Sequence, residues 1–169
     1  GDHNHDEVVG IASQVKNATI ISSAEEARSL KKMKRAGVVS QSTQMIENVN
    51  EILNILSEKV YDLRFVNTIC YPTRRNHEQI KKLADTCDLM VVIGSYTSAN
   101  SKRLTQLSLA RNKNSFQVTC ADELKRSWFS NIGSVGISAG ASTPDDLIAD
   151  VISKIKIFSK IKVKEEIYE

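Results

Sequence analysis

The sequence predicts an α/β protein made of two small, similar units, each a mainly parallel sheet flanked by helices. Strand-like and helix-like patterns alternate along the chain, which is typical of parallel strands joined by helical crossovers. The segment from Leu89 to Gly94 is apolar, as expected of a strand buried on both faces of a parallel sheet. The strands fall into two groups. The corresponding segments are a first domain at 1–62, a second domain at 63–160 and a charged tail at 161–169.

The first domain contains a strand, a helix, a second strand and a longer helix. Ala18–Ser22 is rich in β-branched residues and predicts the first strand. Ser23 and Glu26 have the spacing of a capping box, so a helix is expected to begin there and to run to about Met33. Gly37–Ser40 predicts the second strand. The longer helix carries apolar residues at helical spacing: Met45, Val49, Ile52, Leu53, Leu56 and Val60.

The second domain continues the alternation. The predicted strands are Leu63–Ile69, Leu89–Gly94, Phe116–Thr119 and Val135–Ser138. The helices expected between them are Arg74–Thr86, a helix that includes Leu104–Arg111, and Ala121–Phe129. The last helix has the clearest start, because Thr143 is a favourable N-cap and Pro144 suits the first helical position.

Composition excludes several classes of protein. The chain has 169 residues, of which 41% are hydrophobic and 25% charged, as in ordinary soluble domains. No apolar run approaches the roughly 20 residues of a membrane span, so no membrane partner is expected. The net charge is only +3 and aromatic residues make up 5%, so the basic clusters are interpreted as solvated helix faces rather than as a nucleic-acid surface. The three widely spaced cysteines indicate a reducing, cytoplasmic location.

The start of the sequence predicts a fragment. Gly1 opens the chain inside a polar loop, with no initiator Met and no strand before it. An α/β domain normally begins with a strand, so we expect an N-terminal part to be absent from this sequence.

Five short polar loops carry most of the chemistry. Loops at the carboxyl ends of strands form the binding crevice of an open α/β sheet. Together the five loops of this chain hold one thiol, one His, one carboxylate and several hydroxyls, and these groups suit a metal-dependent reaction on a phosphorylated substrate. The loops are His5-Asp6-Glu7, Ser40-Gln41-Ser42-Thr43, Cys70-Tyr71-Pro72-Thr73, Ser98-Ala99-Asn100-Ser101 and Ala139-Gly140-Ala141-Ser142.

Cys70 is the candidate metal ligand. It follows a predicted strand and precedes a predicted helix, where the thiolate, the form that binds metals, is favoured. The alternative is a buried structural cysteine. A phosphatase loop is excluded, because that loop needs an Arg at the position that Asn76 occupies.

His5 and Glu7 are a candidate pair for proton transfer. If this segment is extended, both side chains point to one face and can act together on a substrate hydroxyl. The alternative is a solvated surface pair.

Ser98, Asn100, Ser101 and Ser142 are candidate anion ligands. They are expected at helix N-termini, where free N–H groups and the helix dipole favour anions. Ordinary N-capping is the alternative for each loop. No Gly-Lys-Ser/Thr sequence is present, so neither the Ser98–Ser101 loop nor the Ala139–Ser142 loop is a Walker sequence.

Taken together, these loops resemble the 4-hydroxy-3-methylbut-2-enyl diphosphate reductase family from Gly1 to about Ile157. The pieces that carry the resemblance are Asn4-His5-Asp6-Glu7-Val8, Ser40-Gln41-Ser42-Thr43, Thr68-Ile69-Cys70-Tyr71, Gly94-Ser95 through Ser98-Ala99-Asn100-Ser101-Lys102-Arg103, and Ser138-Ala139-Gly140-Ala141-Ser142. The resemblance implies a three-domain pseudo-symmetric fold, of which this chain holds the middle and C-terminal domains. It also implies removal of the substrate's hydroxyl as water with two electrons and protons, giving isopentenyl and dimethylallyl diphosphates.

The resemblance further implies a role for each candidate residue and a cofactor. Cys70 matches one ligand of a 4Fe–4S cluster, Glu7 matches the proton-delivering acid, and ferredoxin or flavodoxin is the implied electron donor. The implied ligands of the small-molecule diphosphate substrate are His5, Ser42, Thr43, Ser98, Asn100 and Ser142.

The sequence also departs from the family. Asp6 stands where Pro is usual, Ser42 where Thr is usual, and Ala99 where Ser is frequent. The family's other cluster cysteines belong to a preceding domain, and Cys87 and Cys120 do not match them. Because such clusters need several thiolates, the chain alone is expected to be an inactive fragment.

Two alternatives to a reductase fragment remain. The chain could be a non-catalytic diphosphate- or nucleotide-binding α/β module that needs no metal. It could also be a plain α/β scaffold with capped helices, if the five loops do not meet in space.

Overall fold

The computed structural model describes residues 1–159, so the tail expected at 161–169 lies outside the described residues. Two compact units divide the chain: unit 1 is Gly1–Arg74, and unit 2 begins at Arg75. No helix within the described part is both long and apolar enough to cross a membrane. The elements are α1 (Asp6–Ser13), α2 (Ala24–Ser29), β1 (Met33–Val39), α3 (Ile46–Ser57), β2 (Val60–Val66), α4 (Tyr71–Thr86), β3 (Leu89–Ile93), α5 (Ala99–Leu109), β4 (Ser115–Val118), the 3₁₀ turns η1 (Ala121–Glu123) and η2 (Arg126–Phe129), β5 (Val135–Ala139) and α6 (Asp145–Ser159).

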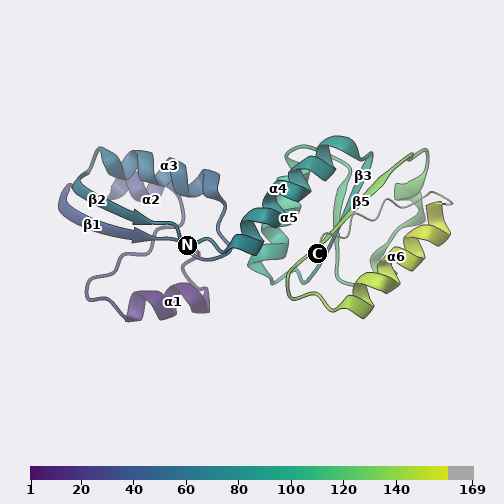
Figure 1. The fold of residues 1–169 in the computed structure, drawn as a ribbon, viewed down its shortest axis with the longest axis horizontal. Coiled ribbons are helices and arrows are strands. Elements are labelled where there is room, and N and C mark those ends of the chain that lie inside the picture. Colours follow the sequence, from purple (N-terminus) through teal and green to yellow (C-terminus); the bar gives the residue numbers. More distant parts are fainter. Residues whose placement is uncertain (160–169) are drawn as a thin grey trace. The chain divides into compact units, whose positions relative to one another are not determined.

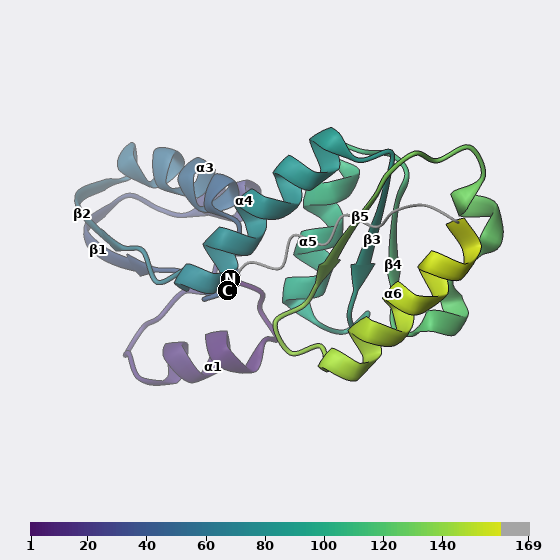
Figure 2. The same ribbon diagram turned by 45° about the vertical axis from the view of Figure 1, so that its right-hand side comes forward.

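Unit 1 is built on a parallel pair of strands, β1 and β2 (Figure 1). Helices α2 and α3 cover one face of this pair, and α1 lies on the other side, as both ribbon views show (Figure 2). Ala36 and Val38 of β1 point into the core beneath α2 and α3, so the residues between them face the side of α1. The buried residues of this core are Ala27, Ile52, Leu56 and Val60.

The division between the units differs from the expected one. Strand β2 pairs with β1 from Val60 to Val66, so both strands belong to unit 1. A boundary between residues 62 and 63 would cut this strand, and the structure divides the chain at Arg74 instead. Val60 was expected at the end of a helix, but it begins β2 because it pairs with Met33.

The helix expected after Ser23 is confirmed at its start but not at its end. The Ser23 hydroxyl accepts the Glu26 N–H at 3.3 Å, and the Glu26 carboxylate accepts the Ser22 N–H at 2.7 Å. The helix ends at Ser29 rather than near Met33, because Met33 already pairs with β2.

The strand expected at Ala18–Ser22 is absent from the described structure. The segment has no strand beside it, so no ladder forms. Its carbonyls accept other donors: the Gly1 amino group donates to Ile21 O at 2.7 Å, and the Asn48 side chain donates to Ser22 O at 3.4 Å. Helix α1, by contrast, was not expected, although Asp6 and Glu7 in its first turn suit a helix N-terminus.

Unit 2 contains a three-stranded parallel sheet in the order β4-β3-β5. Every residue of β3 is buried, which confirms the expectation of a central parallel strand. The two ribbon views place α5 and α6 on opposite faces of this sheet (Figures 1 and 2). The buried apolar cluster on the α6 side comprises Leu89, Val91, Ile93, Val118, Leu124, Phe129, Val135, Val151 and Ile155.

The single helix expected at Ala121–Phe129 is replaced by the two short turns η1 and η2. Leu124 and Lys125 between the turns are extended, with ψ angles of 129° and 124°. Leu124 is buried in the core, and the Trp128 ring stacks on Phe116 with centroids 4.0 Å apart. These tertiary contacts override the local helical pattern. The remaining predicted elements are confirmed with shifted ends.

Candidate functional site

In unit 1, the carboxylate of Glu7 is bound directly to the loop that carries Ser42. Glu7 lies in the first turn of α1, where the helix dipole favours a negative charge. Its Oε1 accepts the Ser42 backbone N–H at 2.6 Å, and its Oε2 accepts the Ser42 hydroxyl at 2.8 Å. Two residues that are far apart in sequence therefore form one hydrogen-bonded pair.

Cys70 joins the same cluster through the backbone. Its N–H donates to the Ser42 carbonyl at 3.0 Å, and α4 begins at the next residue. The thiol is half-buried, and its sulfur lies 2.8 Å from the Thr73 hydroxyl. We call Glu7, Ser42 and Cys70 the unit 1 cluster. It brings together an acid, a hydroxyl and a thiol, which are three of the groups expected from sequence.

The Ser40–Thr43 loop is held by two residues that were in the quoted motifs but were not among the candidate site residues. Thr68 accepts the Ser40 N–H at 2.8 Å, and the buried Gln41 donates through its side chain to the Thr43 hydroxyl at 3.2 Å. The Gln41 carbonyl oxygen also accepts the Asp2 N–H at 2.9 Å. An uncharged amide inside a polar loop was the available signal for Gln41, because such a group can both donate and accept.

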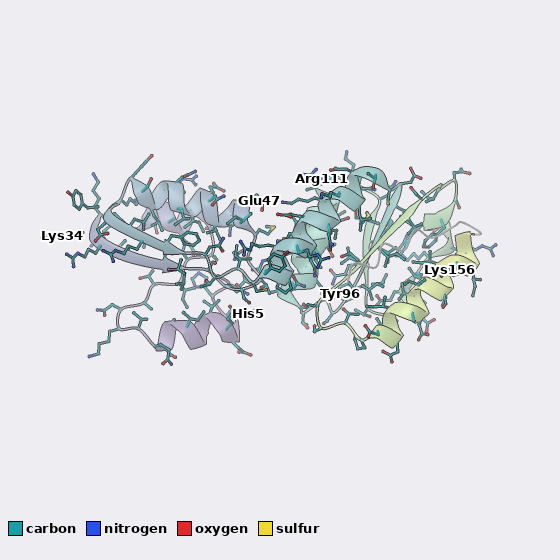
Figure 3. All side chains as sticks on the ribbon, viewed as in Figure 1. His5, Lys34, Glu47, Tyr96, Arg111 and Lys156 are labelled. Carbon is teal, nitrogen blue, oxygen red and sulfur yellow. The ribbon has the colours of Figure 1, made fainter. Side chains whose placement is uncertain are left out.

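His5 does not pair with Glu7 in the expected way. The segment is not extended throughout: His5, labelled in Figure 3, is the N-cap of α1, and Glu7 already lies in the helix. The Nδ1 atom of His5 accepts the Glu7 N–H at 3.3 Å. His5 thus positions the start of the helix that carries Glu7, and the expectation of two side chains on one face of an extended segment is wrong.

In unit 2, polar residues gather at the N-terminus of α5. The Ser98 hydroxyl accepts the Ser101 N–H at 3.3 Å, so Ser98 is an N-cap, as the alternative interpretation expected. Asn100 is 9% exposed, and its Oδ1 atom has no hydrogen-bond partner within the described residues. A buried carbonyl oxygen without a partner is costly, and a bound group that donates a hydrogen bond is one way to satisfy it.

The turns after β3 and β5 lie against Ser101. Gly94 has a φ of 156°, and a Cβ atom at Gly94 or Gly140 would overlap the buried Ser101 hydroxyl. The Gly140 N–H donates to Ile93 O at 2.9 Å, which places the two strand ends side by side. Ser142 follows in the exposed turn after β5. We call Ser98, Asn100 and Ser142 the unit 2 cluster; all three lie in the turns at the carboxyl ends of β3 and β5.

Tyr96 and Glu123 form a further polar network that the sequence did not reveal. The Tyr96 hydroxyl, labelled in Figure 3, donates to Glu123 Oε2 at 2.8 Å. The Thr119 N–H donates to the same carboxylate at 2.6 Å, and this bond chiefly lowers the pKa of Glu123. Partial burial, followed by the hydrogen bond to Glu123, raises the pKa of Tyr96.

The thiols of this chain do not fit a complete iron–sulfur cluster. All three cysteines are free; Cys70 belongs to unit 1, while Cys87 and Cys120 belong to unit 2. No group of three or more His, Cys, Asp or Glu side chains within residues 1–159 could hold a metal ion. A 4Fe–4S cluster needs several thiolates, so Cys70 could supply one ligand only.

The fold and the two clusters define an α/β protein with polar loops at the carboxyl ends of parallel strands, an arrangement suited to binding an anionic substrate. A family model described as LytB protein matches residues 1–156. The chain therefore belongs to the LytB family, and the resemblance expected from its loops is confirmed.

Two relatives of this chain carry a reductase name. A protein of Geobacter metallireducens named 4-hydroxy-3-methylbut-2-enyl diphosphate reductase is 39% identical over 163 residues, covering 96% of this chain. One from Campylobacter jejuni subsp. jejuni with the same name is 42% identical over 159 residues, covering 94%. The chain spans only 58% and 57% of the length of these two relatives.

Two solved structures are also similar. One, described as (E)-4-hydroxy-3-methyl-but-2-enyl diphosphate reductase, the terminal enzyme of the non-mevalonate pathway, is 37% identical with a TM-score of 0.56; the match covers 93% of this chain and 57% of that one. The other, a reductase from Plasmodium falciparum, has a TM-score of 0.88 at 22% identity, covering 99% of this chain and 55% of that one. The second similarity shows the fold alone.

Proposed function

We propose that this chain is part of a 4-hydroxy-3-methylbut-2-enyl diphosphate reductase and supplies the middle and C-terminal domains of a three-domain, pseudo-symmetric enzyme. The whole enzyme would remove the substrate's hydroxyl as water, using two electrons and two protons, to give isopentenyl and dimethylallyl diphosphates. Family membership and the reductase names of the relatives support this proposal.

The unit 1 cluster is the observation that carries the proposal. Glu7 would deliver a proton to the departing hydroxyl, because a carboxyl group held by the Ser42 loop is a positioned acid. The hydroxyls of Ser42 and Thr43 would hydrogen-bond the substrate's alcohol, and His5 would contribute to binding the diphosphate through the ring nitrogen that does not cap α1. Cys70 would be one thiolate ligand of the metal centre.

The unit 2 cluster would bind the diphosphate. The N-terminus of α5 favours anions, and Ser98 can donate its hydroxyl hydrogen while its oxygen caps the helix. The Asn100 amide would donate to a phosphate oxygen through its nitrogen. Ser142 would donate from the exposed turn after β5.

The proposed cofactor is a 4Fe–4S cluster, which supplies the electrons when bound. Its remaining thiolates would come from polypeptide outside this chain, because Cys70 is the one cysteine that matches a cluster ligand. Ferredoxin or flavodoxin would be the electron donor, and the cytoplasm the location.

The test is to complete the enzyme. Residues 1–169 alone should show no reductase activity. Joined to the remaining part of the Geobacter metallireducens relative and prepared without oxygen, they should bind iron and reduce 4-hydroxy-3-methylbut-2-enyl diphosphate. Cys70→Ser should lower both iron content and activity, and Glu7→Gln should lower activity alone. Cys87→Ser is the matched control, because Cys87 belongs to unit 2 and comes just before β3, at the opposite end of this strand from the unit 2 cluster. Full activity of the Cys70→Ser enzyme would refute the assignment.

A second candidate function is diphosphate binding without redox chemistry. The N-terminus of α5, where Ser98 is the N-cap, favours it, because the free N–H groups of a helix N-terminus bind anions without a metal. Calorimetry of residues 1–169 with inorganic pyrophosphate distinguishes the two candidates. Binding without iron that is weakened by Asn100→Ala, together with an inactive completed enzyme, would favour the binding module over the reductase.

A further inference from the structure

One side chain of unit 2 connects the turn before α5 to α5 itself. Gln117 lies on β4, and its side-chain nitrogen donates to the carbonyl oxygens of Gly94 at 3.0 Å and Ser95 at 3.1 Å. Its side-chain oxygen accepts the hydroxyl of Thr105 on α5 at 3.1 Å. Successive residues of a strand point to opposite faces, and Phe116 packs on the α6 side, so Gln117 faces the side of α5. The Gln117 amide therefore ties together the two segments that meet at the N-terminus of α5.

Both ends of this link reach residues at the start of α5. The Ser95 carbonyl that accepts from Gln117 also accepts the Ser98 N–H, at 3.1 Å. The Thr105 hydroxyl shares its one hydrogen between the Gln117 side-chain oxygen and the Ser101 carbonyl, which lies 2.9 Å away. The backbone of Ser98 is thus fixed from the side of the turn, and the first turn of α5 is fixed from the side of the helix.

A second pair of side chains braces the same turn. The Tyr96 hydroxyl donates to Glu123 Oε2 at 2.8 Å and lies 3.2 Å from the backbone oxygen of Gln117. Thr119 anchors the Glu123 carboxylate in turn, because its N–H donates at 2.6 Å and its hydroxyl at 3.0 Å. Tyr96 is 50% exposed, so little apolar burial holds it in place, and these hydrogen bonds fix its orientation.

We propose that Gln117 is a positioning residue for diphosphate binding, which holds the turn before α5 against α5, with the Tyr96–Glu123 pair as a brace. The Ser98 hydroxyl and the N–H groups at the start of α5 then stay in the geometry that binds a phosphate group. This inference rests on the proposed role of the unit 2 cluster, and it needs neither the metal centre nor unit 1. Donors that are already in place bind an anion without the entropic cost of ordering the turn.

The experiment measures the affinity of residues 1–169 for inorganic pyrophosphate by calorimetry. Gln117→Met keeps the length of the side chain and adds no charge, but it removes both the donor and the acceptor. It should weaken binding by roughly tenfold. Asp122→Asn is the control, because this exposed carboxylate pairs with Lys154 rather than with the turn, and it should leave the affinity unchanged.

Two results would overturn the inference. One is native affinity in Gln117→Met. The other is the absence of pyrophosphate binding by residues 1–169, because a turn already held by these contacts should bind the anion by itself.

Variants of the brace distinguish positioning from stability. Glu123→Ala removes the acceptor of the Tyr96 hydroxyl and should weaken binding by about threefold, although loss of a negative charge alone would strengthen it. Glu123→Gln keeps an acceptor oxygen and should bind at least as tightly as the native chain, even where urea unfolding shows lower stability. If Gln117→Met does not fold, Tyr96→Phe at its exposed position should weaken binding by about threefold. Native affinity in both Glu123→Ala and Tyr96→Phe would also overturn the inference.

The completed enzyme separates this inference from the proposed function. There, Gln117→Met should raise KM for the diphosphate substrate by roughly tenfold and leave kcat unchanged, because the reacting hydroxyl is bound by the unit 1 cluster. A completed enzyme that is inactive, but whose pyrophosphate affinity depends on Gln117, would refute the reductase function and support the positioning role.

Discussion

Replacing Glu7 with Gln tests whether the unit 1 cluster is held by its charge. The carboxylate accepts two hydrogen bonds from Ser42, at 2.6 and 2.8 Å. A hydrogen bond to a charged group contributes about 1.5–3 kcal/mol, and a neutral one about 0.5–1.5 kcal/mol. Both groups are partly exposed, so the lower ends apply. If the single acceptor oxygen of Gln takes the Ser42 N–H, that bond should weaken by about 1 kcal/mol, and the bond from the Ser42 hydroxyl is lost because the amide nitrogen cannot accept it.

The assay is amide hydrogen exchange at Ser42, whose N–H donates to Glu7. Since 1.4 kcal/mol corresponds to tenfold, exchange at Ser42 should become about fivefold faster in Glu7→Gln. Exchange at Cys70 should rise with it, because its N–H donates to the Ser42 carbonyl. Asp6→Asn, which removes an exposed charge from the same helical turn, is the control and should leave Ser42 unchanged. Unaltered exchange at Ser42 in Glu7→Gln would refute the reasoning.

Two further predictions concern the stability of unit 2: one changes Gly94, and the other changes Glu123. Gly94→Ala should destabilise unit 2 by about 1–3 kcal/mol in urea unfolding, because the new methyl group meets the Ser101 hydroxyl and the backbone φ is 156°. Gly10→Ala, in α1 with open space around it, should cost nothing. Because hydrogen bonds lower the pKa of Glu123 below its ordinary 4.5, its contribution to stability is present above pH 4.5 and is lost as the pH falls through the folded-state value. Glu123→Gln should therefore flatten the acid limb of the stability profile, and an unchanged limb would contradict this.

Local sequence was sufficient for the elements whose signal is contained within a few residues. The apolar run at Leu89–Ile93 predicts a buried parallel strand, and the capping pattern at Ser23 predicts a helix start; both are observed. The prediction of a helix at Ala121–Phe129 was wrong because Trp128 stacks on Phe116, and the local sequence pattern carries no information about this contact. A segment becomes a strand only where another strand lies beside it. Ala18–Ser22 has the composition of a strand, but it pairs with no strand in the described structure.

The sequence by itself determined which chemical groups lie in the loops, since a thiol, an acid and hydroxyls are properties of residue types. It also determined the family, because short motifs in order survive where overall identity is about 40%. Only the tertiary structure decided that Glu7 binds Ser42, 35 positions away, and that Cys70 hydrogen-bonds the same residue. The physical reason is that a hydrogen bond depends on distance and direction in space, which the packing of helices on strands sets and a residue list does not contain.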